Sequence, residues 1–173
     1  KKEISKTNID KNNILYIIDL DLDFNYTSRL LKKLNNNKNV NLYVKLKPQK
    51  QETKWEKFCI TQNINYFKNE TLDQVNKLKK FDFFIANIST AILEATLYDA
   101  MPLKINSKND FADDLFKDKV VKKINNYNDI IKLTRSKPDF KEINKIFVKV
   151  WGKKKYEPKK IKKIFFNYIY DRK

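Results

Sequence analysis

Short apolar runs separated by stretches with helical spacing constrain the fold of this chain more than any other sequence feature. The runs are rich in β-branched and aromatic residues and lie at 14–18, 40–46, 64–67, 83–86, 103–105 and 120–124. Between most of them, apolar residues recur every three or four positions, at 27–34, 52–58, 72–79 and 90–98. Strands that alternate with helices need crossover connections. We therefore predict a three-layer α/β domain with a mostly parallel sheet and helices on both faces.

The final third of the chain has a different pattern, which predicts extra C-terminal helices at 129–134, at 140–150 and from Pro158 onward. In the last of these, apolar residues between 161 and 169 take one face and lysines between 159 and 163 the other. The apolar stripe predicts core packing, although a basic amphipathic helix also suits an anionic membrane. We interpret residues 1–12 as a linker or arm and residues 13–173 as one Rossmann-like domain.

The composition excludes several classes of site. The chain has no histidine, one glycine and one cysteine, so it lacks residues that a Ser-His-Asp triad, a zinc finger, a Walker A loop or a G-x-G-x-x-G turn needs. We interpret Cys59 as a core residue in a reducing compartment. No apolar run approaches the roughly 20 residues that span a bilayer. The net charge of +17 predicts an anionic partner such as nucleotide phosphate, nucleic acid or lipid headgroups.

Residues 83–105 contain the strongest functional signal. The predicted strand 83–86 leads into Asn87-Ile88-Ser89-Thr90, where hydroxyl side chains can cap the next helix. The unpaired amides and the dipole of a helix start favour phosphate, and the hydroxyls of Ser89 and Thr90 would add donors. Capping alone is the alternative explanation.

Glu94 stands among apolar residues in the same predicted helix. An ionised carboxylate in such surroundings is costly unless something pairs with it. Its partner is either internal, such as a lysine or backbone amides, or a ligand with hydroxyl groups such as a ribose.

The run S-T-A-I-L-E-A-T-L-Y-D-A-M-P-L-K-I, residues 89–105, resembles the nucleotide-sugar-binding motif in the C-terminal half of GT-B glycosyltransferases, especially bacterial enzymes that build capsules and other surface glycans. The resemblance implies that Ser89 and Thr90 contact the donor diphosphate and that Glu94 holds the ribose. The family usually has a glycine turn before the proline, whereas this chain has Asp99 and Ala100. Aspartate tolerates the left-handed conformation, so we expect the turn to form.

Two weaker similarities extend the predicted donor site. The run V-K-L-K-P-Q, residues 44–49, resembles the family's K-x-H-P strand end with Lys47 in place of histidine, and it places Gln49 beside the site. A lysine keeps a cation for phosphate but does not titrate near neutrality, so Lys47 would stabilise charge without transferring protons. The alternative is that Lys45 and Lys47 are ordinary solvated lysines. The predicted strand 64–67 resembles the segment of the family that contacts the nucleotide base. The resemblance therefore adds Tyr66 to the predicted donor site.

The resemblance covers about residues 13–171, which is half of a GT-B enzyme. It implies the donor-binding domain of a glycosyltransferase that uses a nucleotide-activated sugar to build bacterial capsule or lipopolysaccharide. The acceptor and the usual catalytic base belong to an N-terminal domain absent from this chain, so we expect the chain to be inactive alone and name no catalytic residue. No metal ion or organic cofactor is expected. We predict a cytoplasmic location, with the basic charge allowing peripheral association with the inner membrane.

Two other hypotheses use different residues. Asp19 and Asp21 follow a strand as D-x-D, which resembles the nucleophile and general acid of haloacid-dehalogenase-like phosphatases, with magnesium bound. That hypothesis also uses Ser89 or Thr90, Lys104 and the Asp113-Asp114 pair, but Leu22 replaces the usual glycine. On the glycosyltransferase interpretation, Asp21 and Asp23 simply begin a loop.

The third hypothesis, a nucleic-acid-binding module, depends on the charge of +17 and on interleaved tyrosines and lysines. The chain has neither an RNA-recognition nor a helix-turn-helix signature, so we predict no nucleic-acid partner.

Overall fold

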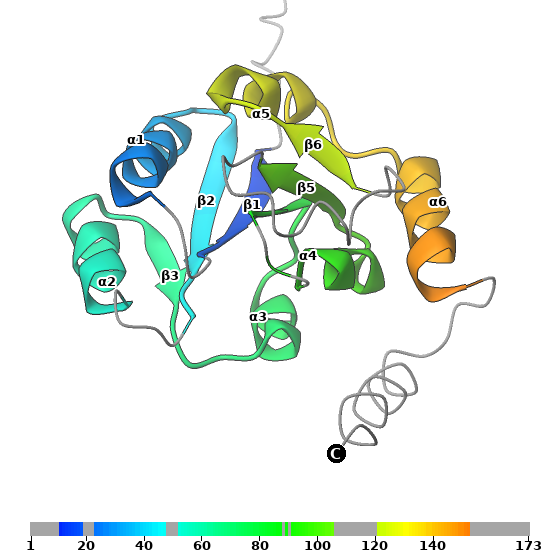
Figure 1. Cartoon of the computed structure of the whole chain (residues 1–173), viewed down its shortest axis with the longest axis horizontal. Coiled ribbons are helices and arrows are strands. Elements are labelled where there is room, and N and C mark those ends of the chain that lie inside the picture. Colours follow the sequence, from blue (N-terminus) through cyan, green and yellow to red (C-terminus); the bar gives the residue numbers. More distant parts are fainter. Residues whose placement is uncertain are drawn as a thin grey trace, which may run out of the picture.

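A single parallel sheet organises the computed structural model, which describes residues 11–18, 23–47, 52–87, 89, 91–105 and 121–152 (Figure 1). Its six strands lie in the order β3-β2-β1-β4-β5-β6, and every neighbouring pair is parallel. The strands are β1 (Asn12–Ile17), β2 (Val40–Lys45), β3 (Asn65–Phe67), β4 (Phe83–Ala86), β5 (Met101–Ile105) and β6 (Lys122–Ile124). The predicted Rossmann-like α/β fold is confirmed.

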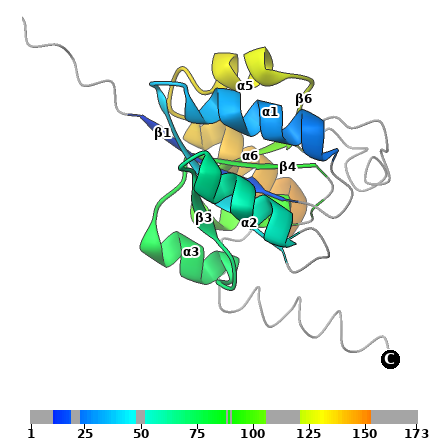
Figure 2. The same ribbon diagram turned by 90° about the vertical axis from the view of Figure 1, so that its left-hand side faces the viewer.

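The helices follow the predicted segments with small shifts at their ends. They are α1 (Phe24–Asn35), α2 (Glu52–Thr61), α3 (Leu72–Leu78), α4 (Ala91–Glu94), the 3₁₀ helix η1 (Ala95–Tyr98), α5 (Tyr127–Leu133) and α6 (Phe140–Trp151). Figure 2 looks onto the side of the molecule where α1, α2 and α3 lie. The predicted helix from Pro158 and most of the predicted arm 1–12 fall outside the described residues.

One predicted helix is divided. Residues 90–98 were expected as a continuous helix, but the α-helical turn ends at Glu94 and continues as a 3₁₀ turn. Thr96 donates its hydroxyl to the Leu93 carbonyl at 3.1 Å, and only Asp99 and Ala100 separate η1 from β5. A 3₁₀ turn is tighter than an α-helical turn, which suits so short a connection.

Side chains of β1 alternate between two apolar cores, one on each face of the sheet. Ile14, Tyr16 and Ile18 pack on the face covered by α1, α2, α5 and α6, whereas Leu15 and Ile17 pack on the face covered by α3 and α4. The five residues are each at most 1% exposed. This two-sided burial, with the period of two that a strand imposes, produces the predicted three layers.

Polar side chains cap the N-termini of several helices. Asp23 Oδ1 accepts from the backbone amides of Asn25 and Tyr26 at 2.8 and 3.2 Å, so it caps α1. Thr71 and Gln74 form a reciprocal capping box at the start of α3. Asp23, the last acid of the 19–23 triplet, is therefore the cap of a helix and not the loop-entry residue that the glycosyltransferase interpretation expected.

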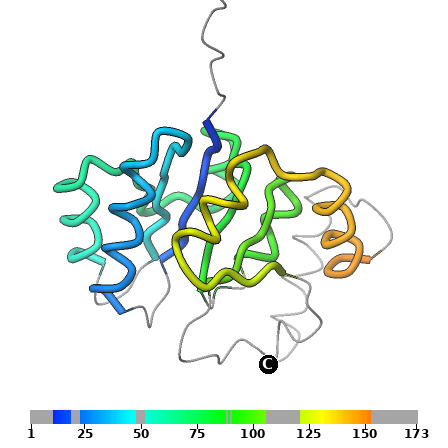
Figure 3. Tube along the Cα trace, turned by 90° about the horizontal axis from the view of Figure 1, so that it is seen from above, coloured from blue at the N-terminus to red at the C-terminus, as the bar shows by residue number. Residues whose placement is uncertain are grey.

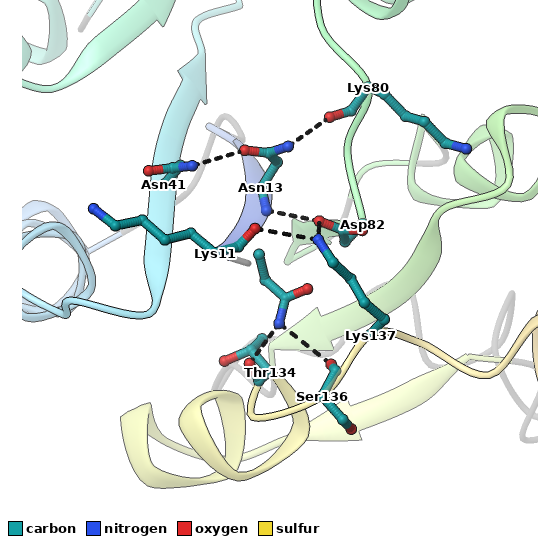
Figure 4. A network of polar contacts seen from close by, with 9 residues as sticks. Lys11, Asn13, Asn41, Lys80, Asp82, Thr134, Ser136 and Lys137 are labelled. Carbon is teal, nitrogen blue, oxygen red and sulfur yellow. Dashed lines mark hydrogen bonds and ion pairs between the residues drawn. The ribbon is translucent and has the colours of Figure 1, made fainter. Parts of the chain in front are cut away.

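A polar network at the amino end of the sheet ties the α5–α6 connection to β1 (Figure 4). Asp82 Oδ2 accepts from the Asn13 amide at 2.8 Å and from Lys137 Nζ at 3.0 Å. The side-chain amide of Asn12 donates to the Thr134 carbonyl at 2.6 Å. These contacts hold the α5–α6 connection against the amino end of the sheet.

Cys59 lies in the core between α2 and the sheet, as predicted, and is fully buried. Burial, assisted by the nearby negative charge of Glu56, raises the pKa of the Cys59 thiol to about 12. The thiolate is the nucleophilic form, so both access and ionisation oppose reaction.

We predict that Cys59 reacts with a thiol reagent at pH 8 at least about 100-fold more slowly in the folded protein than in denaturant, because little thiolate forms. The Cys59→Ala/Ile60→Cys variant is the matched control, since Ile60 on the same helix is 63% exposed. It should label rapidly. Equal labelling of the two folded proteins would contradict the buried placement of Cys59.

Candidate functional site

The strand order creates a topological switch between β1 and β4. The chain leaves β1 through α1 toward β2 and β3, then returns to β4 on the other side of β1 and continues to β5. In parallel sheets of this kind, connections that diverge from two neighbouring strands leave a crevice at the carboxyl ends, where ligands bind. Ser89 follows β4 at this position, and Lys47 follows β2.

The structure brings two of the predicted site residues into direct contact. Lys47 Nζ donates to Ser89 Oγ at 2.6 Å, although the residues are 42 positions apart in the sequence. Lys47 is half-buried and Ser89 is only 6% exposed. A cation and a hydroxyl therefore meet at the carboxyl end of the sheet.

Ser89 also performs the capping role that the sequence allowed. Its Oγ accepts from the Ala91 amide at 3.3 Å, and its carbonyl accepts from the Ile92 amide at 3.1 Å. A serine hydroxyl has two lone pairs and one proton. With both lone pairs engaged by Lys47 and Ala91, Ser89 still has an O–H to donate.

Lys45 corrects one of the alternatives considered for the two lysines. It is 8% exposed and is not a solvated surface residue, because its Nζ donates to the carbonyls of Leu46 and Lys68 at 2.6 and 2.8 Å. Burial lowers the pKa of Lys45, while Glu70 and Glu52 oppose that shift. Lys45 thus ties β2 to the segment that follows β3, beside Lys47.

The Tyr66 hydroxyl is directed toward α2. It donates to Glu56 Oε1 at 3.1 Å, and Glu56 also pairs with Lys68 at 2.8 Å. Burial, followed by the hydrogen bond to Glu56, raises the pKa of Tyr66. This hydrogen bond links Tyr66 of β3 to α2. Contact between Tyr66 and the nucleotide base stays a prediction.

Glu94, the last residue of α4, is half-buried. Burial is the main cause that raises the pKa of Tyr98 to about 12, and the negative charges of Glu94 and Asp73 add to it. The Tyr98 ring stacks on Phe84 of β4, with centroids 6.3 Å apart. The Glu94 carboxylate therefore lies near enough to the Tyr98 hydroxyl to influence its ionisation.

The turn after η1 takes the form that the sequence analysis expected. Asp99 has φ 58° and ψ 28°, the left-handed conformation that favours glycine, and the Ala100 amide donates to the Ala95 carbonyl at 3.0 Å. Aspartate thus replaces the glycine of the family motif without abolishing the turn. Pro102 follows inside β5.

Lys104, which the phosphatase hypothesis used, is fully buried in β5 and is in register with Ala86 of β4. The glycosyltransferase interpretation gave it no role, although a lysine inside an apolar strand was visible in the sequence. Thr90, Gln49, Asp19, Asp21 and Asp113-Asp114 lie outside the described residues. Their proposed roles stay predictions.

The described residues hold neither a cluster of metal ligands nor a membrane-spanning helix. No group of three or more histidine, cysteine, aspartate or glutamate side chains there is arranged to hold a metal ion. No helix in that part of the chain has both the length and the apolar character to cross a bilayer.

Comparison with known proteins yields distant structural likenesses but no match in sequence. No protein-family model matches the chain, and no curated protein matches it at a significant level. The crystal structure of TarM superimposes with a TM-score of 0.48 at 12% sequence identity, over 93% of this chain and 36% of TarM. The chain thus spans about a third of the length of TarM. A likeness this distant assigns no function to the chain.

We predict that Asp99→Gly is more stable than Asp99→Ala by about 1 kcal/mol, because alanine meets the left-handed penalty that glycine avoids. The free energy of unfolding in urea measures the difference. Asn36 at the end of α1 is the matched control, since its φ of −79° is right-handed. There the glycine variant should not exceed the alanine variant in stability. The same order at both positions would contradict the turn geometry.

Proposed function

We propose that this chain is the donor-binding half of a glycosyltransferase and that it binds a nucleoside-diphosphate sugar at the switch between β1 and β4. The observation that carries the proposal is the 2.6 Å contact between Lys47 Nζ and Ser89 Oγ. Residues from the ends of two strands there offer one positive charge and one hydroxyl donor, which suits an anionic diphosphate.

In the proposed complex, Lys47 and Ser89 bind the diphosphate. As the bond to the sugar breaks, negative charge grows on the leaving diphosphate, and a fixed cation and donor stabilise it without reorganising. Lys47 replaces the histidine of the related motif, so the step gains charge stabilisation and no proton from this position. Thr90 and Gln49 are proposed to add donors to the same group.

Glu94 is proposed to accept hydrogen bonds from the ribose hydroxyls. A half-buried carboxylate binds a diol more tightly than a fully solvated one does, because less water competes. Its place one turn beyond Ser89 supports a nucleoside lying along α4.

The broader proposal follows from the sequence resemblance. The donor is used for a bacterial surface glycan, the acceptor and catalytic base come from an N-terminal domain, and the enzyme works at the cytoplasmic face of the inner membrane. A net charge of +17 supports attraction to anionic headgroups.

We predict that one of the uridine, cytidine, guanosine or adenosine diphosphates raises the melting temperature by about 5 °C at 100 times its dissociation constant. Lys47→Met, Ser89→Ala and Glu94→Gln should each reduce the shift. Lys57→Met, an exposed lysine on α2, removes the same charge elsewhere and should leave it unchanged.

The same assay tests the phosphatase hypothesis through Asp19→Asn. The donor-binding proposal fails if no nucleotide shifts the wild type, or if magnesium with a phosphate mimic stabilises it only while Asp19 is intact. Sugar transfer by the 173-residue chain alone would contradict the half-enzyme assignment.

A further inference from the structure

A hollow lies between α1 and α5, which run side by side on one face of the sheet (Figure 3). Its volume is about 340 Å³, within the range of small-ligand pockets. The α1–α5 groove is lined by Tyr26, Arg29, Leu30 and Lys33 of α1 and by residues 126–128 at the start of α5. It shares no residue with the Lys47–Ser89 site.

The groove carries two positive charges and no negative one. Arg29 and Lys33 are one helical turn apart, both are exposed, and no carboxylate lines the groove. Within the described part of the chain, neither cation forms an ion pair. The Arg29 Nε donates to the Asn25 carbonyl of its own helix at 3.0 Å, and the two terminal amino groups of the guanidinium remain as donors for a ligand. Like charges at this spacing repel, so an anion between them is stabilising.

Two tyrosine rings also line the groove, and the hydroxyl of each takes part in a hydrogen bond. Tyr26 is 41% exposed, and its hydroxyl donates to the Asn125 carbonyl at 3.4 Å. The Tyr127 hydroxyl accepts from the Asn37 side-chain amide at 3.1 Å, and Lys33 Nζ lies 5.8 Å from the centre of its ring. Such rings offer apolar surface to a ligand ring while their hydroxyls stay anchored.

Asn126 completes the set of groups. Its Oδ1 accepts from the Asp129 amide at 3.1 Å to cap α5, so the NH₂ of the same side chain can donate to a ligand. One site therefore combines a pair of cations, an amide donor and aromatic surface.

We propose that the α1–α5 groove binds a phosphorylated sugar, with the phosphate on Arg29 and Lys33 and the sugar ring against the tyrosines. The two cations lie within one helical turn and so suit a single anionic group, and tyrosine rings line the same hollow. A nucleic-acid strand would need cations spaced along several phosphates. The site is independent of the donor-binding proposal.

The test is an NMR titration of the isotope-labelled full chain with glucose 6-phosphate at low salt. Backbone signals of Tyr26, Lys33 and Tyr127 should shift, and those of Lys47 and Ser89 should not. Glucose and inorganic phosphate are the component probes, and each should bind more weakly than glucose 6-phosphate. Mapping on the wild type keeps the test valid if a variant misfolds.

Arg29→Gln/Lys33→Gln should weaken glucose 6-phosphate binding about tenfold, because each exposed ion pair contributes a few-fold. Lys32→Gln/Lys57→Gln is the matched control, since both lysines are exposed, neither lines the groove, and the pair removes the same charge. The control should bind as the wild type does.

Several results would overturn the proposal. They are no binding at millimolar ligand, equal weakening by the two double variants, and phosphate binding as tightly as the sugar phosphate. Shifts at Lys47 and Ser89 in place of the groove would assign the ligand to the other site. Tighter binding of a single-stranded oligonucleotide to the groove would assign it to nucleic acid.

Discussion

Burial of β1 on both faces is the constraint on which the rest of this structure depends. Five consecutive side chains from Ile14 to Ile18 are excluded from water, and alternate ones point to opposite faces of the sheet. Full burial of an aliphatic side chain contributes about 1.5–3 kcal/mol, so neither face can remain uncovered. Helices must pack on both faces. With β2 on one side and β4 on the other, β1 becomes the central strand, and the switch in strand order falls beside it.

Positive charge in the described part of this molecule has several different environments. Lys45 is buried and held by two backbone carbonyls, Lys47 is half-buried against Ser89, and Arg29 and Lys33 are exposed beside a hollow. Buried cations are costly, so a chain with net charge +17 keeps them only where hydrogen bonds offset the desolvation. The lysines at the end of β2 meet that condition. Cations on the helix surfaces stay hydrated, so they need no such hydrogen bonds.

The periodicity of apolar residues was sufficient to place nearly every described element. β4 occupies residues 83–86 as predicted, and α6 differs from its predicted bounds by one residue. Helical turns occupy 91–98, as the pattern at 90–98 predicts, but the pattern did not show that the α-helical turn ends at Glu94 and a 3₁₀ turn follows. It records which residues are buried but not how tightly the backbone must turn before β5. Lys45 shows the same limit. Its burial depends on the Leu46 and Lys68 carbonyls, and Lys68 belongs to the segment after a different strand.

The sequence by itself determined the alternation of strands and helices, the capping role of Ser89 and the left-handed turn at Asp99. These depend on local backbone geometry, which the residue type and its immediate neighbours control. Only the tertiary structure decided that Lys47 meets Ser89, that Tyr66 is bonded to α2, and that Arg29 and Lys33 border a groove with α5. Each of those contacts joins segments brought together by crossover connections. Their positions follow from the packing of all the helices on one sheet, which no local pattern encodes.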